Sequence, residues 1–242
     1  MIKAEFHTHT HYSHDSFLGK FAYLFMLKLR KINAVAVTDH NTIEGAQYLK
    51  PFLEKHGIKV IIGEEIFTSQ GEIIGLFLKE NIPPCLTAKE TAEEIKKQGG
   101  IVYVPHPYDT KRSKTVLKED AIASIKTMID VMEIHNGRNI SDVFSEKQKE
   151  LAERYNICPI IGSDAHTAAE LGRNYIIIND FTTAEELLTN LKSAAFVTKK
   201  VLKSAHTATK VVRLLKLAAA GKFNEILRII KRKFRNRNKT SA

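Results

Sequence analysis

Short apolar runs rich in β-branched residues alternate along most of the chain with stretches whose apolar residues recur at helical spacing. The runs predict strands at residues 3–6, 34–38, 58–62, 73–78, 101–104, 131–134, 157–161 and 175–178. This alternation of strands and helices predicts α/β architecture with a largely parallel sheet. Seven or eight strands within about 180 residues fit a small barrel of the β/α type.

The clearest helix signal covers residues 87–98. Thr87, followed three residues later by Glu90, is typical of a capping box, and Gly99-Gly100 is typical of a helix end. Similar patterns predict helices over 21–31, 43–56, 118–128 and 143–155.

Polar residues of the kinds that bind metals follow the predicted strands. They are His7 and His9 after the first strand, Asp39 and His40 after the second, Glu64 and Glu65 after the third, His106 after the fifth, His135 at the end of the sixth, and Asp164 and His166 after the seventh. All lie at carboxyl ends of strands, where barrels and open α/β sheets place their active sites. Glu72 is the exception, because it lies at the start of its strand.

Two of these groups have i, i+2 spacing. In an extended segment His7 and His9 point the same way and can reach one metal ion, and the same holds for Asp164 and His166. Taken alone, each pair has another interpretation. The histidines are then ordinary surface residues, and Ser163 or Asp164 is a helix N-cap.

The next two motifs are equally ambiguous when taken alone. Asp39 is a candidate cap for the helix that begins near Thr42, which leaves His40 at the strand end. We expect at least one of Glu64 and Glu65 to be a solvated loop acid. The carboxylate of Glu65 has two oxygens and therefore suits a bridge between two metal ions.

His106 lies between Pro105 and Pro107, whose restricted backbones preorganise it, although a lone histidine there is also typical of a turn.

Taken together, five histidines and several acids gather at one end of the predicted barrel. Burying so many ionisable groups side by side is costly unless a metal compensates them. Mixed imidazole and carboxylate ligands suit Zn, Mn or Fe rather than Ca or Mg. The sequence therefore predicts a centre of two or three divalent transition metals.

Composition narrows the class of protein. Hydrophobic residues make up 43% and charged residues 26%, as in a soluble globular protein. Two cysteines, Cys85 and Cys158, argue against a disulfide scaffold or a cysteine-based zinc knuckle. The sequence has no apolar run of about 18 residues and no apolar segment after Met1 of the signal-peptide kind. We therefore expect no membrane-spanning helix and a cytoplasmic protein.

The net charge of +10 is unevenly distributed. Residues 201–242 contain 12 of the 37 lysines and arginines but only one of the 27 acidic residues. The other 200 residues are close to neutral, with 25 basic and 26 acidic side chains. We therefore expect a neutral barrel domain over residues 1–200 and a basic helical extension over 201–242.

The extension has two apolar stripes at helical spacing. The first is Val211, Leu214, Leu215 and Ala218, the second is Phe223, Ile226, Leu227, Ile230 and Phe234, and Arg228, Lys231, Arg232 and Arg235 lie opposite the second. One interpretation packs both helices on the barrel through these stripes. The other gives the basic face to RNA, DNA or an anionic membrane surface. We expect residues 236–242 to be frayed.

In their order along the chain these motifs resemble those of the PHP (polymerase and histidinol phosphatase) family. The stretch from His7 to Asp15, HTHTHYSHD, is similar to the first family motif. The later motifs are matched by TDH at 38–40, GEEI at 63–66, HP at 106–107 and GSDAH at 162–166. The resemblance covers about residues 1–200.

The resemblance implies a distorted seven-stranded β/α barrel, similar to a TIM barrel, that holds a trinuclear metal centre. By the family pattern the first metal is held by His7, His9, Glu65 and Asp164, the second by Glu65 and His106, and the third by Asp15, His40 and His166. The family often has a histidine on the strand after the bridging acid. This sequence has Glu72 at the matching place, and glutamate can also bind a metal.

The activity implied is that of a metal-dependent phosphoesterase, in which a metal-activated water attacks a small phosphomonoester, a nucleotide or a nucleic-acid end. Arg138 and Arg173 are candidate phosphate-binding residues, and Arg112 is a weaker one. We expect His135 to lie behind the ligands or to face the substrate. Two alternatives stay open: an amidohydrolase-like metallohydrolase, and a non-catalytic metal-binding module directed to polyanions by the basic extension.

Overall fold

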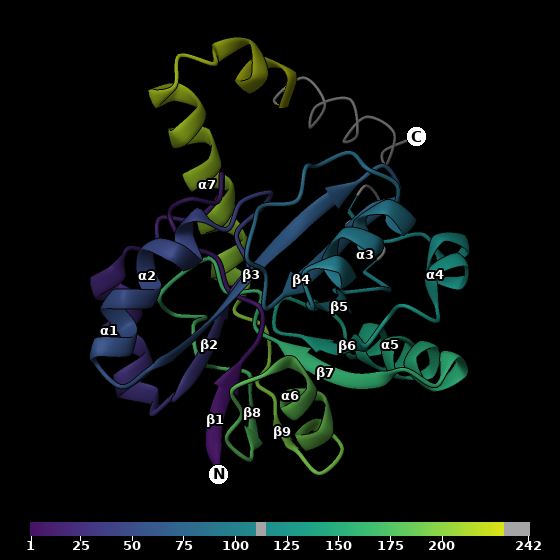
Figure 1. The fold of residues 1–242 in the computed structure, drawn as a ribbon. Helices are drawn as coiled ribbons and strands as arrows, with labels where there is room; N and C mark the ends of the chain where they lie inside the picture. Colours follow the sequence, from purple (N-terminus) through teal and green to yellow (C-terminus); the bar gives the residue numbers. More distant parts are fainter. Residues whose placement is uncertain (110–114, 230–242) are drawn as a thin grey trace.

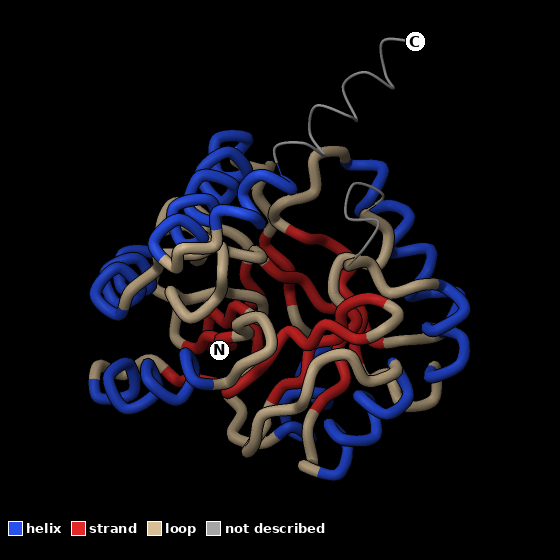
Figure 2. Tube along the Cα trace, turned by 90° about the horizontal axis from the view of Figure 1, so that it is seen from above, coloured by secondary structure: helices blue, strands red, loops and turns tan. Residues whose placement is uncertain are grey.

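A computed structural model of the chain describes residues 1–109 and 115–229 (Figure 1). Of the residues named above, Arg112, Ile230, Lys231, Arg232, Phe234, Arg235 and 236–242 lie outside the described residues. Within the described residues, nine strands form one sheet in the order β7-β6-β5-β4-β3-β2-β1-β8-β9. Figure 2 shows these strands in the interior, with the helices around the outside.

The elements follow one another as the alternation of patterns predicts. The strands are β1 (Ile2–Glu5), β2 (Ala34–Val37), β3 (Lys59–Thr68), β4 (Gly71–Leu76), β5 (Ile101–Val104), β6 (Val131–Asn136), β7 (Cys158–Gly162), β8 (Tyr175–Ile178) and β9 (Ala195–Val197). The helices are α1 (Lys20–Arg30), α2 (Glu44–Lys55), α3 (Ala88–Lys97), α4 (Glu119–Ile125), α5 (Asp142–Tyr155), α6 (Ala184–Leu191) and α7 (Lys203–Ala219). All eight expected strands form, and β9 is an additional one.

The sheet is mixed, so the prediction of a largely parallel sheet is only half right. The strand pairs β1–β2, β2–β3, β5–β6 and β6–β7 are parallel. The pairs β3–β4, β4–β5, β1–β8 and β8–β9 are antiparallel. The physical reason at β3–β4 is the connection, since Ser69 and Gln70 alone join the two strands. A link this short makes a hairpin, whereas a parallel pair needs a crossover.

The sheet curls into a barrel-like shape and is nearly closed at the carboxyl ends of β1 and β7. The segment after β1 pairs there with the segment after β7 through a parallel bridge between Thr8 and Ala165. The N–H of His9 donates to the Ala165 carbonyl at 2.9 Å, and the N–H of Ala165 donates to the His7 carbonyl at 3.2 Å. This pairing brings together the segments that carry His7, His9 and Asp164.

Apolar helix faces hold the sheet in place. On one side α1 and α2 bury Tyr23, Leu27, Leu49 and Leu53 in a common apolar cluster. On the other side α3, α4 and α5 pack into a larger cluster that spans the rest of the sheet. The predicted capping box of α3 is confirmed, because Thr87 Oγ1 accepts from the Glu90 N–H at 3.2 Å and the Glu90 carboxylate accepts from the Thr87 N–H at 2.8 Å.

The C-terminal helix α7 lies against the rim of the barrel (Figure 1). Two residues of its apolar stripe do not make the contact, since Val211 and Leu215 are 49% and 55% exposed. Ala205 and Thr209 are buried instead. The expectation that this stripe packs on the barrel is therefore wrong for Val211 and Leu215. None of the helices in the described part of the chain has the length and apolar character that a membrane crossing requires.

Candidate metal centre

His7 and His9 lie side by side, fully buried, directly after β1. Their Nε2 atoms lie 3.5 and 3.4 Å from Oε2 of Glu65. The same two nitrogens lie 3.8 and 3.5 Å from Oδ1 of Asp164, which follows β7. The i, i+2 spacing thus brings both imidazoles to the same pair of carboxylates, as an extended segment should.

A second group of side chains surrounds the other oxygen of Glu65. Nε2 of His106 lies 3.0 Å from Oε1 of Glu65 and 3.6 Å from Oε2 of Glu72. Because β4 runs antiparallel to β3, with Phe67 opposite Glu72, the start of β4 lies beside the end of β3. This explains why Glu72 joins the group although it begins its strand.

Asp15, His40 and His166 form the third group. Asp15 Oδ1 lies 3.6 Å from His40 Nε2 and 3.2 Å from His166 Nε2. His40 Nδ1 lies 3.1 Å from Oε2 of Glu65, which links this group to the first two. The ring of His9 lies beside those of His40 and His166, with centroids 4.5 and 4.0 Å away.

The structure therefore brings all nine predicted metal-binding side chains to one end of the sheet. Their ligand atoms fall into overlapping groups of three within 4.8 Å of one another, and these groups also include His14, which lies next to Asp15. The group His7–His9–Asp164 contains three of the four ligands that the family pattern implies for the first metal, whereas the group His7–Glu65–His106 joins His7 to the two that it implies for the second. The assignment of individual ligands stays a prediction.

The charges in the cluster compensate one another. Burial lowers the pKa of His7, but Glu65, Asp164 and Glu133 raise it more, so this pKa is well above its ordinary value. Burial and the neighbouring His166 and His40 hold the pKa of His9 well below its ordinary value. The pKa of His40 rises to about 10 because Glu65, Asp15 and Glu72 outweigh its burial. The carboxylates thus favour positive charge around His7 and His40, which is the charge that bound metal cations would supply.

Two observations favour metal ions over a proton-only network. The buried Nε2 atoms of His7 and His9 have no hydrogen-bond partner among the residues that the structure describes, and the lone pair of such a nitrogen can bind a metal cation. His106 and Asp164 adopt positive φ angles of 31° and 52°, which non-glycine residues rarely do. The donor set, imidazole nitrogens with carboxylate oxygens, fits divalent transition metals.

Glu133 on β6 holds the cluster from behind, and sequence reasoning missed it. It is buried, its Oε1 lies 3.1 Å from Nδ1 of His7 and accepts from the Tyr103 hydroxyl at 2.6 Å, and its Oε2 accepts from the His106 N–H at 2.7 Å. Gly162 makes room for these contacts, because a Cβ there would lie 2.4 Å from Glu133 Oε1. The available signal was a lone acid inside a buried apolar strand.

Two expectations about acids are wrong. Both Glu64 and Glu65 are buried, so neither is a solvated loop acid. Glu64 Oε2 accepts from the Ile82 N–H at 2.9 Å, and burial raises the pKa of Glu64 to about 7. Asp39 does not cap α2, whose N-cap is Ile43.

Asp39 instead organises the loop that carries Asp15. Its Oδ1 accepts from the Thr10 N–H and the Ser13 hydroxyl, both at 2.6 Å, and its Oδ2 accepts from the Thr10 hydroxyl at 2.7 Å. Ser13 Oγ also lies 3.1 Å from His9 Nδ1. A buried carboxylate with this many donors fixes the loop in one conformation.

Arg138 is buried between internal partners. Its Nε lies 3.0 Å from Oε1 of Glu170, and its guanidinium donates to the Thr209 hydroxyl on α7. Oε2 of Glu170 accepts from the N–H groups of His166 and Thr167 at 3.1 and 3.0 Å. This arrangement does not support the predicted phosphate contact of Arg138, and it makes Arg138 a link between α7 and the loop of His166.

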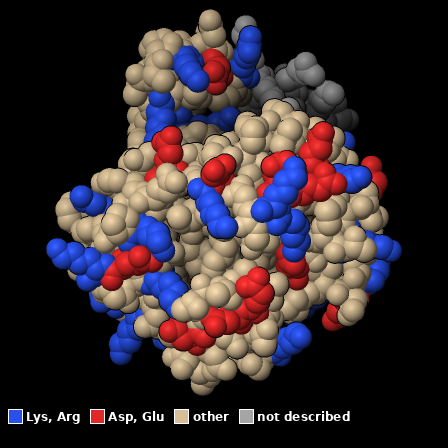
Figure 3. Space-filling model, in the orientation of Figure 1, with Lys and Arg blue, Asp and Glu red and all other residues tan. Residues whose placement is uncertain are grey.

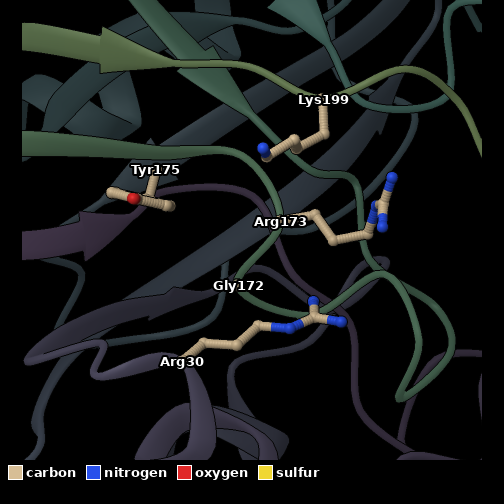
Figure 4. Close-up of a pocket in the computed structure, with 5 residues that line it drawn as sticks. All are labelled: Arg30, Gly172, Arg173, Tyr175 and Lys199. Carbon is tan, nitrogen blue, oxygen red and sulfur yellow. The ribbon is translucent and has the colours of Figure 1, made fainter.

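Arg173 lies away from the cluster, in a hollow of about 260 Å³ that it lines with Arg30, Gly172, Tyr175 and Lys199 (Figure 4). Phosphate binding by Arg173 stays a prediction, and it concerns this hollow.

His135, the remaining candidate, points from β6 toward α5, where its Nδ1 lies 3.0 Å from Ser145 Oγ. It belongs to none of the possible metal-binding groups in the described chain. This agrees with the family pattern, which does not need a ligand there.

Comparison with known proteins places this arrangement in a family. The family model described as PHP-associated matches residues 145–196. One uncharacterized protein of Methanocaldococcus jannaschii is 33% identical over 177 residues, covering 72% of this chain and 70% of that one. A second from the same organism is 44% identical over 117 residues, 44% of this chain and 68% of the other.

A solved structure shares the fold. It is a two-domain protein of Bacteroides vulgatus containing a predicted PHP-like metal-dependent phosphoesterase, with a TM-score of 0.63 and 17% identity. The match covers 81% of this chain but 64% of that one, so this chain spans less than two thirds of that protein.

The fold and the cluster define an α/β barrel with imidazole and carboxylate side chains gathered at one end of its sheet. The chain belongs to one family with the relative that it matches over 177 residues, and the PHP-associated family model identifies that family as the PHP family.

Proposed function

We propose that this chain is a metal-dependent phosphoesterase that hydrolyses a small phosphomonoester, a nucleotide or a nucleic-acid end. The observation that carries the proposal is the placement of Glu65. Its two carboxylate oxygens face two different sets of imidazoles, with Oε1 at 3.0 Å from His106 and Oε2 at 3.4 and 3.1 Å from His9 and His40. A carboxylate placed in this way is suited to bridge metal ions, and such clusters are typical of phosphoryl-transfer sites.

The residues present fit two or three divalent metals. His7, His9 and Asp164 would hold one with Glu65. His106 and Glu72 would share Glu65 for the second, and Asp15, His40 and His166 would hold the third. When bound, such ions would lower the pKa of water and neutralise the charge of a phosphate ester.

The protein's own side chains determine from which side a substrate approaches. The side chains of His7, His9, Glu65 and His106 are 0% exposed. The side chains of His40 and Asp15 are 13% and 15% exposed, and His14 beside them is 53% exposed. A substrate therefore reaches the cluster from the third group, whereas Glu133, Tyr103 and the strands exclude water behind the first two.

The test combines elemental analysis with an assay on the same sample. We expect two to three equivalents of Mn, Zn or Fe per chain. We also expect hydrolysis of p-nitrophenyl phosphate that stops on chelation and returns when metal is added. Asp164→Ala and His9→Ala, purified in the same way, control for a contaminating phosphatase and should be inactive.

The other outcomes separate the alternatives. Hydrolysis of an amide but not of a phosphoester would favour the amidohydrolase-like interpretation. A folded protein that takes up no Mn or Zn would contradict the catalytic proposal and favour a binding module. Binding of nucleic acid or an anionic membrane through residues 201–242 stays a prediction, which filter binding and vesicle sedimentation would test.

A further inference from the structure

Helix α7 is fastened to the loop that forms the mouth of the cluster. The ammonium of Lys216 donates to the carbonyls of His11 and Ser13, both at 2.6 Å, and lies 5.2 Å above the ring of Phe17. Two hydrogen bonds from one charged group to two carbonyls of the same loop fix the end of a helix at a defined place. The loop so fixed is the one that carries His9 and Asp15.

A second attachment lies two turns earlier on the same helix. Thr209 and the carbonyl of Ala205 accept from the guanidinium of Arg138, and Nε2 of His206 lies 3.1 Å from the carbonyl of Arg138. Arg138 in turn pairs with Glu170, which holds the loop of His166. Both attachments therefore end on segments that carry predicted metal ligands.

These attachments define which face of α7 is turned to the barrel. Thr209 and Lys216 are seven residues apart, which is about two helical turns, so they lie on one face. Arg213 comes four residues after Thr209 and three before Lys216 and must share that face. Figure 3 shows lysine and arginine side chains gathered where the C-terminal helical segment meets the body of the molecule.

Arg213 is nevertheless exposed, and the helix face that it shares with Lys216 is turned to the carbonyls of His11 and Ser13, directly before the exposed His14. Nε2 of His14 lies 3.9 Å from Asp15, and its ring lies 4.9 Å from that of His40. In the described part of the chain no carboxylate forms an ion pair with Arg213. A guanidinium with free donors thus stands beside the open side of the cluster.

We propose that Arg213 forms an anion-binding subsite at the mouth of the centre and binds a phosphate oxygen of the substrate, and that Lys216 is the positioning residue that holds α7 in place for this contact. The inference rests on the proposed function. Arginine suits the role because its planar fork of donors matches phosphate oxygens, and a cation at the mouth raises the local concentration of an anionic substrate. The substrate phosphate then lies between the metal cluster and α7.

The first experiment compares Arg213→Ala with Lys210→Ala. Lys210 is exposed, is on the same helix and carries the same charge. It lies about 100° around the helix from Thr209 and about 120° from Lys216, on the side of Arg213 that is turned away from these two attachments. For the metal-loaded full chain we expect Arg213→Ala to raise KM for a phosphomonoester about 10- to 100-fold while kcat changes little, since a charge-assisted hydrogen bond is lost. Lys210→Ala should leave both within about twofold of the wild type.

A binding measurement makes the subsite testable apart from catalysis. Titration of the Mn-loaded protein with inorganic phosphate should give a Kd about tenfold weaker for Arg213→Ala than for the wild type and Lys210→Ala. Equal phosphate binding by all three proteins, or no binding by the wild type, overturns the subsite. Phosphate binding that depends on Arg213 without any phosphoester hydrolysis overturns the proposed function and leaves the subsite standing.

The positioning role of Lys216 is tested by a double-mutant cycle. Lys216→Ala should raise KM in the wild-type background but much less in the Arg213→Ala background, because it acts through Arg213. Additive effects would show that Lys216 acts in another way. Circular dichroism and thermal unfolding of each variant, followed with metal in excess, exclude a general loss of folding.

Discussion

Oε1 of Glu133 lies 3.1 Å from Nδ1 of His7, and this contact turns the other ring nitrogen of His7, Nε2, toward Glu65 and Asp164. A carboxylate accepts hydrogen bonds, so Glu133 holds the proton of His7 on Nδ1 and leaves the lone pair of Nε2 for a metal. Carboxylates in this position behind histidine ligands fix both the tautomer and the ring orientation. The same carboxylate accepts from the His106 N–H, so one buried acid orients ligands of two predicted metals.

Replacement of Glu133 by glutamine should weaken metal binding without unfolding the chain. The amide keeps the volume and one acceptor, but it loses the charge that stabilises His7 as a donor ligand. We expect the affinity for Mn or Zn to fall about 10- to 100-fold in a competition titration with a chelating dye. Glu153→Gln, an exposed change on α5, is the matched control. Unchanged affinity for Glu133→Gln would show that the contact with His7 is not needed for metal binding.

Glu72→Ala should remove one metal ion and leave the others. Oε2 of Glu72 lies 3.6 Å from His106 Nε2, and Oε1 lies 4.0 Å from His40 Nδ1, whereas the first group contains no atom of Glu72. Elemental analysis after dialysis should therefore show about one equivalent fewer than in the wild type. Glu72→His, which restores the side chain common in the family, should keep the full number. A wild-type metal content in Glu72→Ala would exclude Glu72 as a ligand.

The buried carboxyl group of Glu5 should make the protein less stable as the pH rises. Burial raises the pKa of Glu5 from 4.5 to about 8, against the opposing effects of Ser163, Gly172 and Arg30. Between these values the folded chain holds a proton that the unfolded chain has released, so stability is lost with increasing pH. The slope for one such group is about 1.4 kcal/mol per pH unit. Glu5→Gln, which cannot ionise, should lack this slope.

The measurement is urea unfolding of the wild type and Glu5→Gln at several values between pH 5 and 8.5, with metal in constant excess. As the pH rises, the free energy of unfolding of the wild type should fall relative to that of Glu5→Gln. The effects of the other titrating groups cancel in the difference between the two proteins. A difference that is constant with pH would show that Glu5 is ionised in the folded protein.

Much of the fold could be predicted because apolar runs and helical periodicity follow burial directly. The residues that end in the cluster, from His7 to His166, could also be predicted, since they follow successive strands and share one edge of the sheet. The direction of β4 was harder to predict from the sequence. It depends on the two-residue link at Ser69 and Gln70, which places Glu72 beside the end of β3 and turns an apparent exception into a member of the cluster.

The contacts that sequence reasoning missed are polar and distant in the chain. Glu133 is a single acid in a buried strand, and no spacing rule relates it to His7, which lies 126 residues away. The packing of α7 depends on Thr209 and Lys216, whereas the search for helices follows apolar stripes. Hydrophobic periodicity assigns the buried face of a helix only where the contact itself is apolar.

The Arg138–Glu170 pair should contribute more to stability than the exposed ion pairs of this chain. Its side chains are 5% and 6% exposed, and Glu170 also holds the N–H groups of His166 and Thr167. Removing one partner leaves a buried carboxylate without its cation, so Arg138→Ala should lower the free energy of unfolding by about 3–5 kcal/mol. Arg154→Ala is the control. The side chains of Arg154 and its partner Glu119 are 60% and 55% exposed, so loss of this pair should lower the free energy of unfolding by less than about 1 kcal/mol.

Urea unfolding of both variants measures the two losses, and Arg138→Met separates lost charge from lost volume. Equal losses for Arg138→Ala and Arg154→Ala would contradict the role of Arg138 as the link between α7 and the loop of His166. A large loss for Arg138→Ala with unchanged protease sensitivity of α7 would confine that role to the loop.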